Sequence, residues 1–159
     1  MATLKEIAAR FEALQGREIE FYAEAVNEEK DFVLDLNREQ LYDGKDREGN
    51  DLHPTYFEDP YFKSPAQAAG YSRWKDKITP NPRRTPGVPN LFINGYYYKS
   101  IVLAVDKQGL KYNSGFDDQN NINQKYGGKL YGLNSDNRVE LNKVAGPRAI
   151  ELIRTFVRI

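Results

Sequence analysis

The feature that most constrains the fold is a long run of helical periodicity that begins at Arg17. Asp43-Gly44 ends the run, because glycine readily takes the left-handed conformation that follows a helix. At 1.5 Å per residue, about 25 residues form a helix about 38 Å long. A small sheet can pack against a helix of this length. The residues along its broad apolar face are Phe21, Tyr22, Ala25, Val26, Phe32, Val33, Leu36 and Gln40.

The composition limits the classes of protein that remain. The chain has 159 residues, which predicts a single domain over 1–159 that needs no metal or disulfide to stabilise its core. It has no Cys and one His, His53, which excludes disulfide frameworks, thiolate metal sites and multi-His sites. The 23 Lys and Arg balance 23 Asp and Glu, which argues against a surface that coats DNA. An aromatic content of 13% indicates a folded chain, and some of these aromatic side chains are expected to contact other chains.

Amphipathic helices are expected at both ends of the chain. Residues 1–16 read as an N-terminal helix with a Thr3/Glu6 capping box, and Leu4 and Phe11 lie on its apolar stripe. Near the C-terminus, the pattern predicts a helix over 136–145, a break at Gly146-Pro147 and a last helix over 148–159. No apolar run is long enough to cross a membrane.

The centre of the chain combines prolines with the main basic cluster. A helix is expected over 66–77, and segment 79–89 holds four prolines, which favours an extended arm or long loop. A solvated loop, or contact with an acidic partner or a nucleic-acid backbone, would explain this cluster. The basic residues are Arg73, Lys75, Lys77, Arg83 and Arg84.

Residues 90–114 predict a turn followed by a β-hairpin. Strands are expected over 101–105 and 110–114, joined by a turn at 106–109. Tyr96, Tyr97 and Tyr98 directly precede the first strand, and three adjacent side chains cannot all face one core. We therefore expect these tyrosines to divide between the core and a subunit interface. Together with the helices, the hairpin indicates a small antiparallel sheet beside the long helix.

The sequence offers few groups for catalysis or metal binding. The polar loop 43–50 lacks the ligand spacing of an EF-hand. Gly127-Gly128-Lys129 lacks the rest of a phosphate-binding loop, and His53 lies in a turn-rich segment that suits a surface residue. The pair Asp117-Asp118 falls in a polar stretch. We predict no catalytic, cofactor or metal site, and no enzyme activity.

Several short motifs occur in an order that resembles a known family. Gln40–Asp46 is followed by a second glycine, Gly49, and a variable basic linker leads to the motif at Leu91–Ile101. A hairpin that ends at Ser114-Gly115 and a turn at Tyr126-Gly127 complete the series. This order, over about residues 17–145, resembles the virion-morphogenesis or tail-completion proteins of tailed bacteriophages, including Mu-like members. It is most similar to forms carried by phages of Bacteroidetes-type hosts.

The resemblance implies an α+β fold, with a small curved antiparallel sheet packed on the long helix, additional short helices at both termini, and a structural role. Such proteins form part of a ring in the neck that joins the portal-bearing head to the tail, so the expected partners are further copies of the chain and portal, adaptor and tail proteins. The expected location is the virion neck or tail, and the host cytoplasm during assembly. Nucleic acid would be met only as the genome passes. Asn94 stands where the family motif has threonine, and both residues cap turns.

Three other functions remain open at this stage. Residues 73–84 would serve a nucleic-acid-binding accessory protein, with Tyr71 and Trp74 as stacking groups. A small hydrolase acting through Asp117 or Asp118 and a carbohydrate-binding module are the others. For the ring protein, the candidate interface residues are Tyr96, Tyr97, Tyr98, Arg83, Arg84, Leu4 and Phe11.

Overall fold

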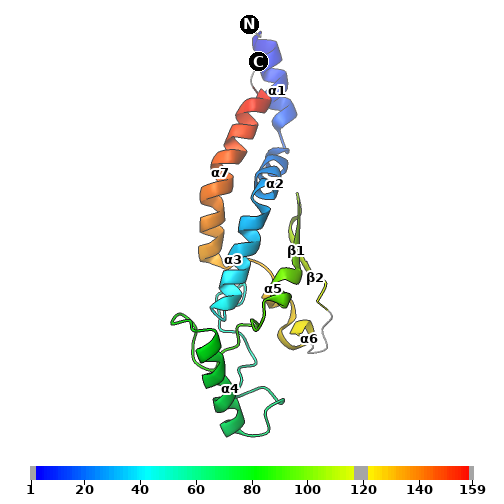
Figure 1. Cartoon of the computed structure of the whole chain (residues 1–159). Coiled ribbons are helices and arrows are strands. Elements are labelled where there is room, and N and C mark those ends of the chain that lie inside the picture. The colour runs from blue at the N-terminus through cyan, green and yellow to red at the C-terminus, as the bar shows by residue number, and fades with distance from the viewer. Residues whose placement is uncertain (1–2, 117–121, 158–159) are drawn as a thin grey trace.

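The computed structural model describes residues 3–116 and 122–157 as an elongated α+β fold (Figure 1). Helix α7 runs alongside α2 and α3, and α1 lies at the same end as the end of α7. Helix α4 lies at the opposite end, and the hairpin lies beside the helices. The elements are α1 Leu4–Leu14, α2 Glu18–Glu28, α3 Lys30–Tyr42, α4 Pro65–Ile78, α5 Tyr96–Ser100, β1 Ile101–Asp106, β2 Gly109–Ser114, α6 Ile122–Tyr126, the 3-10 turn Gly127–Leu130 and α7 Ser135–Val157.

The expected single long helix is two helices, α2 and α3, which meet at Glu29 and continue in a similar direction (Figure 1). The N–H of Glu29 donates to the carbonyl of Val26, three residues back rather than four, which tightens the chain at the junction. The sequence supplies a reason. No apolar residue stands between Val26 and Phe32, a gap longer than one helical turn, so no packed side chain holds the junction in register.

The expected break in the C-terminal region is wrong, because α7 continues through Pro147. A proline inside a helix costs about 3 kcal/mol, so other contacts must hold the helix together. Ala145 and Ala149 are buried on either side of it, and Arg148 makes two hydrogen bonds to Glu28 of α2. Packing on α2 therefore outweighs the local preference of the proline.

The predicted hairpin is confirmed as an antiparallel pair of strands packed on the helices. Ile101 pairs with Ser114, and Asp106 pairs with Gly109 at the turn. Alternation along β1 buries Ile101 and Leu103 on the side of α2 and α3 and leaves Val102 exposed. The hairpin thus closes one side of the core that α2, α3 and α7 form.

Asn37, fully buried on α3, ties a distant loop to this core. Its amide donates to the carbonyls of Leu130 and Gly132, at 3.1 and 3.0 Å. Gln40 donates to Gly132 as well and accepts from the N–H of Asn134. These bonds fix the segment that leads into α7, and they explain why two polar residues stand on a buried helix face.

Candidate protein–protein interface

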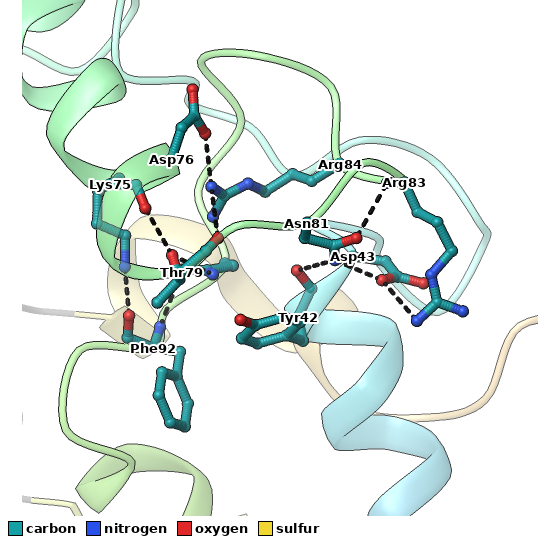
Figure 2. A network of polar contacts seen from close by, with 10 residues as sticks. Tyr42, Asp43, Lys75, Asp76, Thr79, Asn81, Arg83, Arg84 and Phe92 are labelled. Atoms are coloured by element: carbon teal, nitrogen blue, oxygen red, sulfur yellow. Dashed lines mark hydrogen bonds and ion pairs between the residues drawn. The ribbon is translucent and has the colours of Figure 1, made fainter.

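The proline-rich segment 79–89 is a loop fixed to the rest of the molecule (Figure 2). Arg84 is only 5% exposed, and its guanidinium donates to the carboxylate of Asp76 at 2.7 Å. The same guanidinium donates to the carbonyl of Thr79 at 3.3 Å, across the base of the loop. The alternative of an extended arm is therefore wrong, because Arg84 clamps the segment to α4.

A second set of buried bonds continues from Thr79 towards the tyrosine run (Figure 2). The Thr79 hydroxyl donates to the carbonyl of Lys75 and accepts from the amide of Asn90 at 3.1 Å. Lys75 is 2% exposed, and its ammonium donates to the carbonyl of Phe92. Burial, together with the nearby charge of Arg84, lowers the pKa of Lys75 to about 8. The buried Lys75 side chain thus ties the segment that contains Phe92 to α4.

The outer side of the loop is fixed to the end of α3. Asn81 donates to the carbonyl of Tyr42 at 3.1 Å and to the carboxylate of Asp43 at 2.7 Å. Arg83, next to Arg84 but exposed, forms ion pairs with Glu39 at 3.0 Å and Asp43 at 3.2 Å. Arg83 is one of the basic residues that we expected to contact a partner. Its guanidinium is instead paired with carboxylates at the end of α3.

This arrangement corrects the interpretation of the basic cluster. Lys75 and Arg84 are inside the fold, so neither is presented to a partner, and Arg84 is removed from the candidate interface. Arg73, Lys77 and Arg83 remain exposed. A continuous basic surface for nucleic acid would have required all five side chains to face outwards, and the structure does not bring them together in that way.

The tyrosine run occupies α5, directly after Gly95, whose φ of 81° is one that residues with a side chain rarely adopt. Tyr98 is 7% exposed, and its hydroxyl donates to the carbonyl of Asn90. Tyr97 is 5% exposed, whereas Tyr96 is 63% exposed. The structure thus divides the three residues, but it places two of them in the core. Tyr97 and Tyr98 are accordingly removed from the candidate interface, and Tyr96 is kept.

A separate aromatic cluster surrounds α4 at the far end of the molecule. The ring of Tyr71 lies 4.9 Å from that of Tyr56 and 5.2 Å from that of Trp74. Its outer edge is open, since Trp74 is 44% exposed and Tyr61 is 75% exposed. We did not expect Tyr61 as an interface residue, although the density of aromatic residues over 56–62 is visible in the sequence.

Helix α1 lies at the opposite end of the molecule from α4 and exposes large apolar side chains (Figure 1). Its capping box is confirmed: Thr3 accepts from the N–H of Glu6, and Glu6 accepts from the N–H of Thr3 at 2.8 Å. None of its residues is buried, and Leu4 and Phe11 are 86% and 57% exposed. Both candidate residues therefore lie on the surface, where a neighbouring chain can reach them.

The acidic residues of the loop that follows α3 are engaged by the chain itself. The Asp46 carboxylate accepts from the N–H groups of Glu48 and Asn50, at 2.8 and 3.0 Å, and so closes a turn. Lys45 forms an ion pair with Asp51 at 2.6 Å. These contacts give the acidic residues of this polar loop a structural role within the chain.

His53 forms a surface contact with a carboxylate. Its Nδ1 lies 2.8 Å from Glu58, and the N–H of Thr55 donates to the same carboxylate. The Thr55 N–H and the imidazole lower the pKa of Glu58 to about 2. Asp117 and Asp118 lie outside the described residues. Within 3–116 and 122–157, no group of three His, Cys, Asp or Glu residues is arranged to hold a metal ion.

Comparison with known proteins gives no relative: no family model, curated protein or solved structure matches the chain. In the part of the chain that the structure describes, no helix is both long enough and apolar enough to cross a membrane. Among the described residues, large apolar side chains are exposed at both ends of the elongated molecule and also along α2, β1 and α7.

Proposed function

We propose that the chain is a structural virion protein of a tailed bacteriophage that forms part of a ring in the neck and joins the portal-bearing head to the tail. The observation that carries the proposal is that large apolar side chains are exposed at both ends of the molecule, in addition to those exposed along α2, β1 and α7. Leu4 and Phe11 lie at the α1 end, and Tyr61 and Trp74 lie at the α4 end (Figure 1). A ring subunit contacts its two neighbours through different faces, because heterologous contacts close into cycles.

The residues that carry the family resemblance support this proposal through their structural positions. Gly44, in the first motif, lies against the loop: a Cβ there would come within 2.7 Å of Val88 Cγ1. The second motif, 91–101, contains the Lys75-bound carbonyl of Phe92, the turn at Gly95 and the buried Tyr98. Both motifs thus have a role in packing. A motif shared for packing fits a protein whose function is to present surfaces to other chains.

The nucleic-acid-binding alternative has less support. Two of its five basic groups are buried, and Arg83 is paired with carboxylates. Trp74 remains exposed beside Arg73 and Lys77. The salt dependence of binding separates the two functions, since each phosphate contact adds to the loss of affinity as salt rises.

The test is to find the chain in particles. Particles are induced in the host that carries the gene, purified, and analysed by mass spectrometry and by electron microscopy with an antibody against the chain. We expect the protein to copurify and the label to fall between head and tail. Absence of the chain from purified particles in which other virion proteins are detected would overturn the proposal.

A matched pair of variants tests the role of the exposed aromatic surface in the same particles. Trp74→Ser removes an indole that is 44% exposed on α4, and Val139→Ser changes an apolar residue of α7 that is 54% exposed. We expect the first to lower incorporation and the second to leave it unchanged. Equal incorporation of both variants would remove the α4 surface from the proposed contacts.

A further inference from the structure

An apolar crevice lies between α2 and the tip of the hairpin. It has a volume of about 140 Å³ and opens to solvent. A cavity of about 150 Å³ with apolar walls is sufficient to hold a benzene ring. The crevice therefore has the size and the lining to accept one aromatic side chain. Its apolar lining residues are Ile19, Tyr22, Ala23, Val26, Val105 and Leu110.

The same chain exposes an apolar ridge that has no partner in the fold. Leu4, Ala8 and Phe11 follow one another at helical spacing on α1, and all three are exposed. A helix of 11 residues is only marginally stable by itself, even with a capping box. A contact that covers this ridge would therefore stabilise α1 as well as remove Phe11 from water.

The charges of the two elements are complementary. Helix α2 carries four glutamates and no Lys or Arg, and two of these glutamates are paired within the fold, Glu20 with Arg17 and Glu28 with Arg148. Glu18 stands one turn from the crevice residue Tyr22, and Lys107 of the hairpin turn also lines the crevice. Helix α1 carries two basic residues, Lys5 and Arg10, and neither forms an ion pair within the described residues. Of the two glutamates of α1, Glu6 is engaged in the capping box, which leaves Glu12.

We propose that the Phe11 ring of one copy of the chain occupies the crevice between α2 and the hairpin of a second copy. This inference rests on the proposed function, since it names the surfaces through which ring subunits meet. The contact is heterologous: each copy offers one ridge and one crevice, so successive copies join head to tail. A single short helix buries little area, and contacts of this size are weak. The isolated protein therefore associates only at high concentration.

The ridge does not occupy the crevice of its own chain. Helix α1 contacts α7 and extends beyond the start of α2, whereas the crevice lies along α2 beside the hairpin (Figure 1). Gly16, with a φ of 79° and no atoms crowding its Cβ position, joins the two helices. In this arrangement the ridge faces away from the body of its own molecule and is available to another copy.

The test is site-directed cross-linking of the isolated chain, which has no native cysteine. Differently tagged Ala8→Cys and Lys107→Cys proteins, which keep the Phe11 ring and the apolar lining of the crevice, are mixed at about 100 µM, a concentration that suits weak association, and treated with a short bis-maleimide. The control mixture pairs Ala8→Cys with Val139→Cys, at an exposed position of α7 outside the crevice. We expect the first mixture to give the cross-linked heterodimer at least about tenfold faster, because bound thiols have a raised effective concentration.

Equal cross-linking in the two mixtures would overturn the inference. A double variant, Ala8→Cys with Lys107→Cys, is treated in the same way at low concentration. Cross-links formed within one chain would show that α1 folds back into its own crevice, which would also overturn it. The cross-linking uses the isolated chain without other virion proteins. Its outcome is therefore independent of whether the chain is detected in purified particles.

Discussion

At the scale of single residues, Arg83 and Arg84 show how far two adjacent side chains of one type can differ. The Arg84 side chain is 1% exposed and bonds Asp76, whereas the Arg83 side chain is 61% exposed. Removing one partner of a buried ion pair leaves the other charge uncompensated, but exposed pairs contribute little. The two residues thus form a matched pair for testing how the loop is held.

We predict that Arg84→Ala lowers the free energy of unfolding by about 2–3 kcal/mol, somewhat less than for a fully buried pair because Asp76 is half-exposed. Arg83→Ala should lower it by less than about 1 kcal/mol. Urea denaturation of both variants measures the difference. Equal effects would mean that the loop is not anchored through Arg84.

The tyrosine run gives a second prediction at this scale. Tyr98→Ala removes a buried ring that lies 5.2 Å from that of Phe92, so it should cost about 3–5 kcal/mol. Tyr96→Ala removes an exposed ring and should change the stability by less than about 0.5 kcal/mol. Thermal melts of both variants test this. A large loss for Tyr96→Ala would place its ring in a folding contact.

The sequence predicts that these tyrosines divide, but not which of them is buried. The reason is that α5 begins after Gly95 at positive φ, and the direction of each ring depends on where that turn places the helix. Arg84 and Lys75 were misassigned for a related reason. Their burial depends on carboxylate and carbonyl partners from the fold, and charged residues are rarely buried without such partners.

At the scale of elements, α7 shows tertiary packing prevailing over a local signal. Pro147 is exposed and cannot donate to the carbonyl four residues back, yet the helix continues. At Glu29 the local sequence favours one continuous helix, but the structure has a junction between α2 and α3 there. The types of element and the hairpin were predictable from periodicity and turn residues. The continuity of the helices was not, because it depends on contacts such as Arg148 with Glu28.

We predict that Pro147→Ala stabilises the protein by about 1–3 kcal/mol. The change restores one helical hydrogen bond and removes the ring that crowds the preceding turn, while a more flexible unfolded chain offsets part of the gain. Thermal unfolding followed by circular dichroism measures it, with Val144→Ala as an exposed control on the same helix. A lower melting temperature for Pro147→Ala would mean that the helix depends on a bend at the proline.

At the scale of the whole molecule, two kinds of buried titratable group give the stability an alkaline maximum. Burial lowers the pKa of Lys75 from 10.5 to about 8, so between these values the unfolded chain holds a proton that the folded chain has lost. Stability therefore rises with pH in this window. Burial raises the pKa of six tyrosines, so above about pH 10 the unfolded chain loses protons first and stability falls. They are Tyr22, Tyr56, Tyr71, Tyr98, Tyr112 and Tyr126.

We predict a rise in the free energy of unfolding of about 2 kcal/mol between pH 8 and 10, from the shift of the Lys75 pKa. Urea denaturation across this range measures it. Lys75→Met keeps the apolar stem and removes the titrating group, so it should flatten the rise. An unchanged rise in that variant would show that another group titrates.

The pairing of α2 with α7 has a consequence for how the chain folds during synthesis. Arg148 and Glu28 are 120 residues apart in the sequence, and the ring of Phe21 packs 5.3 Å from that of Phe156. Ribosomes add about 5–20 residues per second, so α2 emerges several seconds before its partner exists. During that interval its apolar face is available to chaperones or to other nascent chains. The core formed by these helices closes only after α7 has left the ribosome.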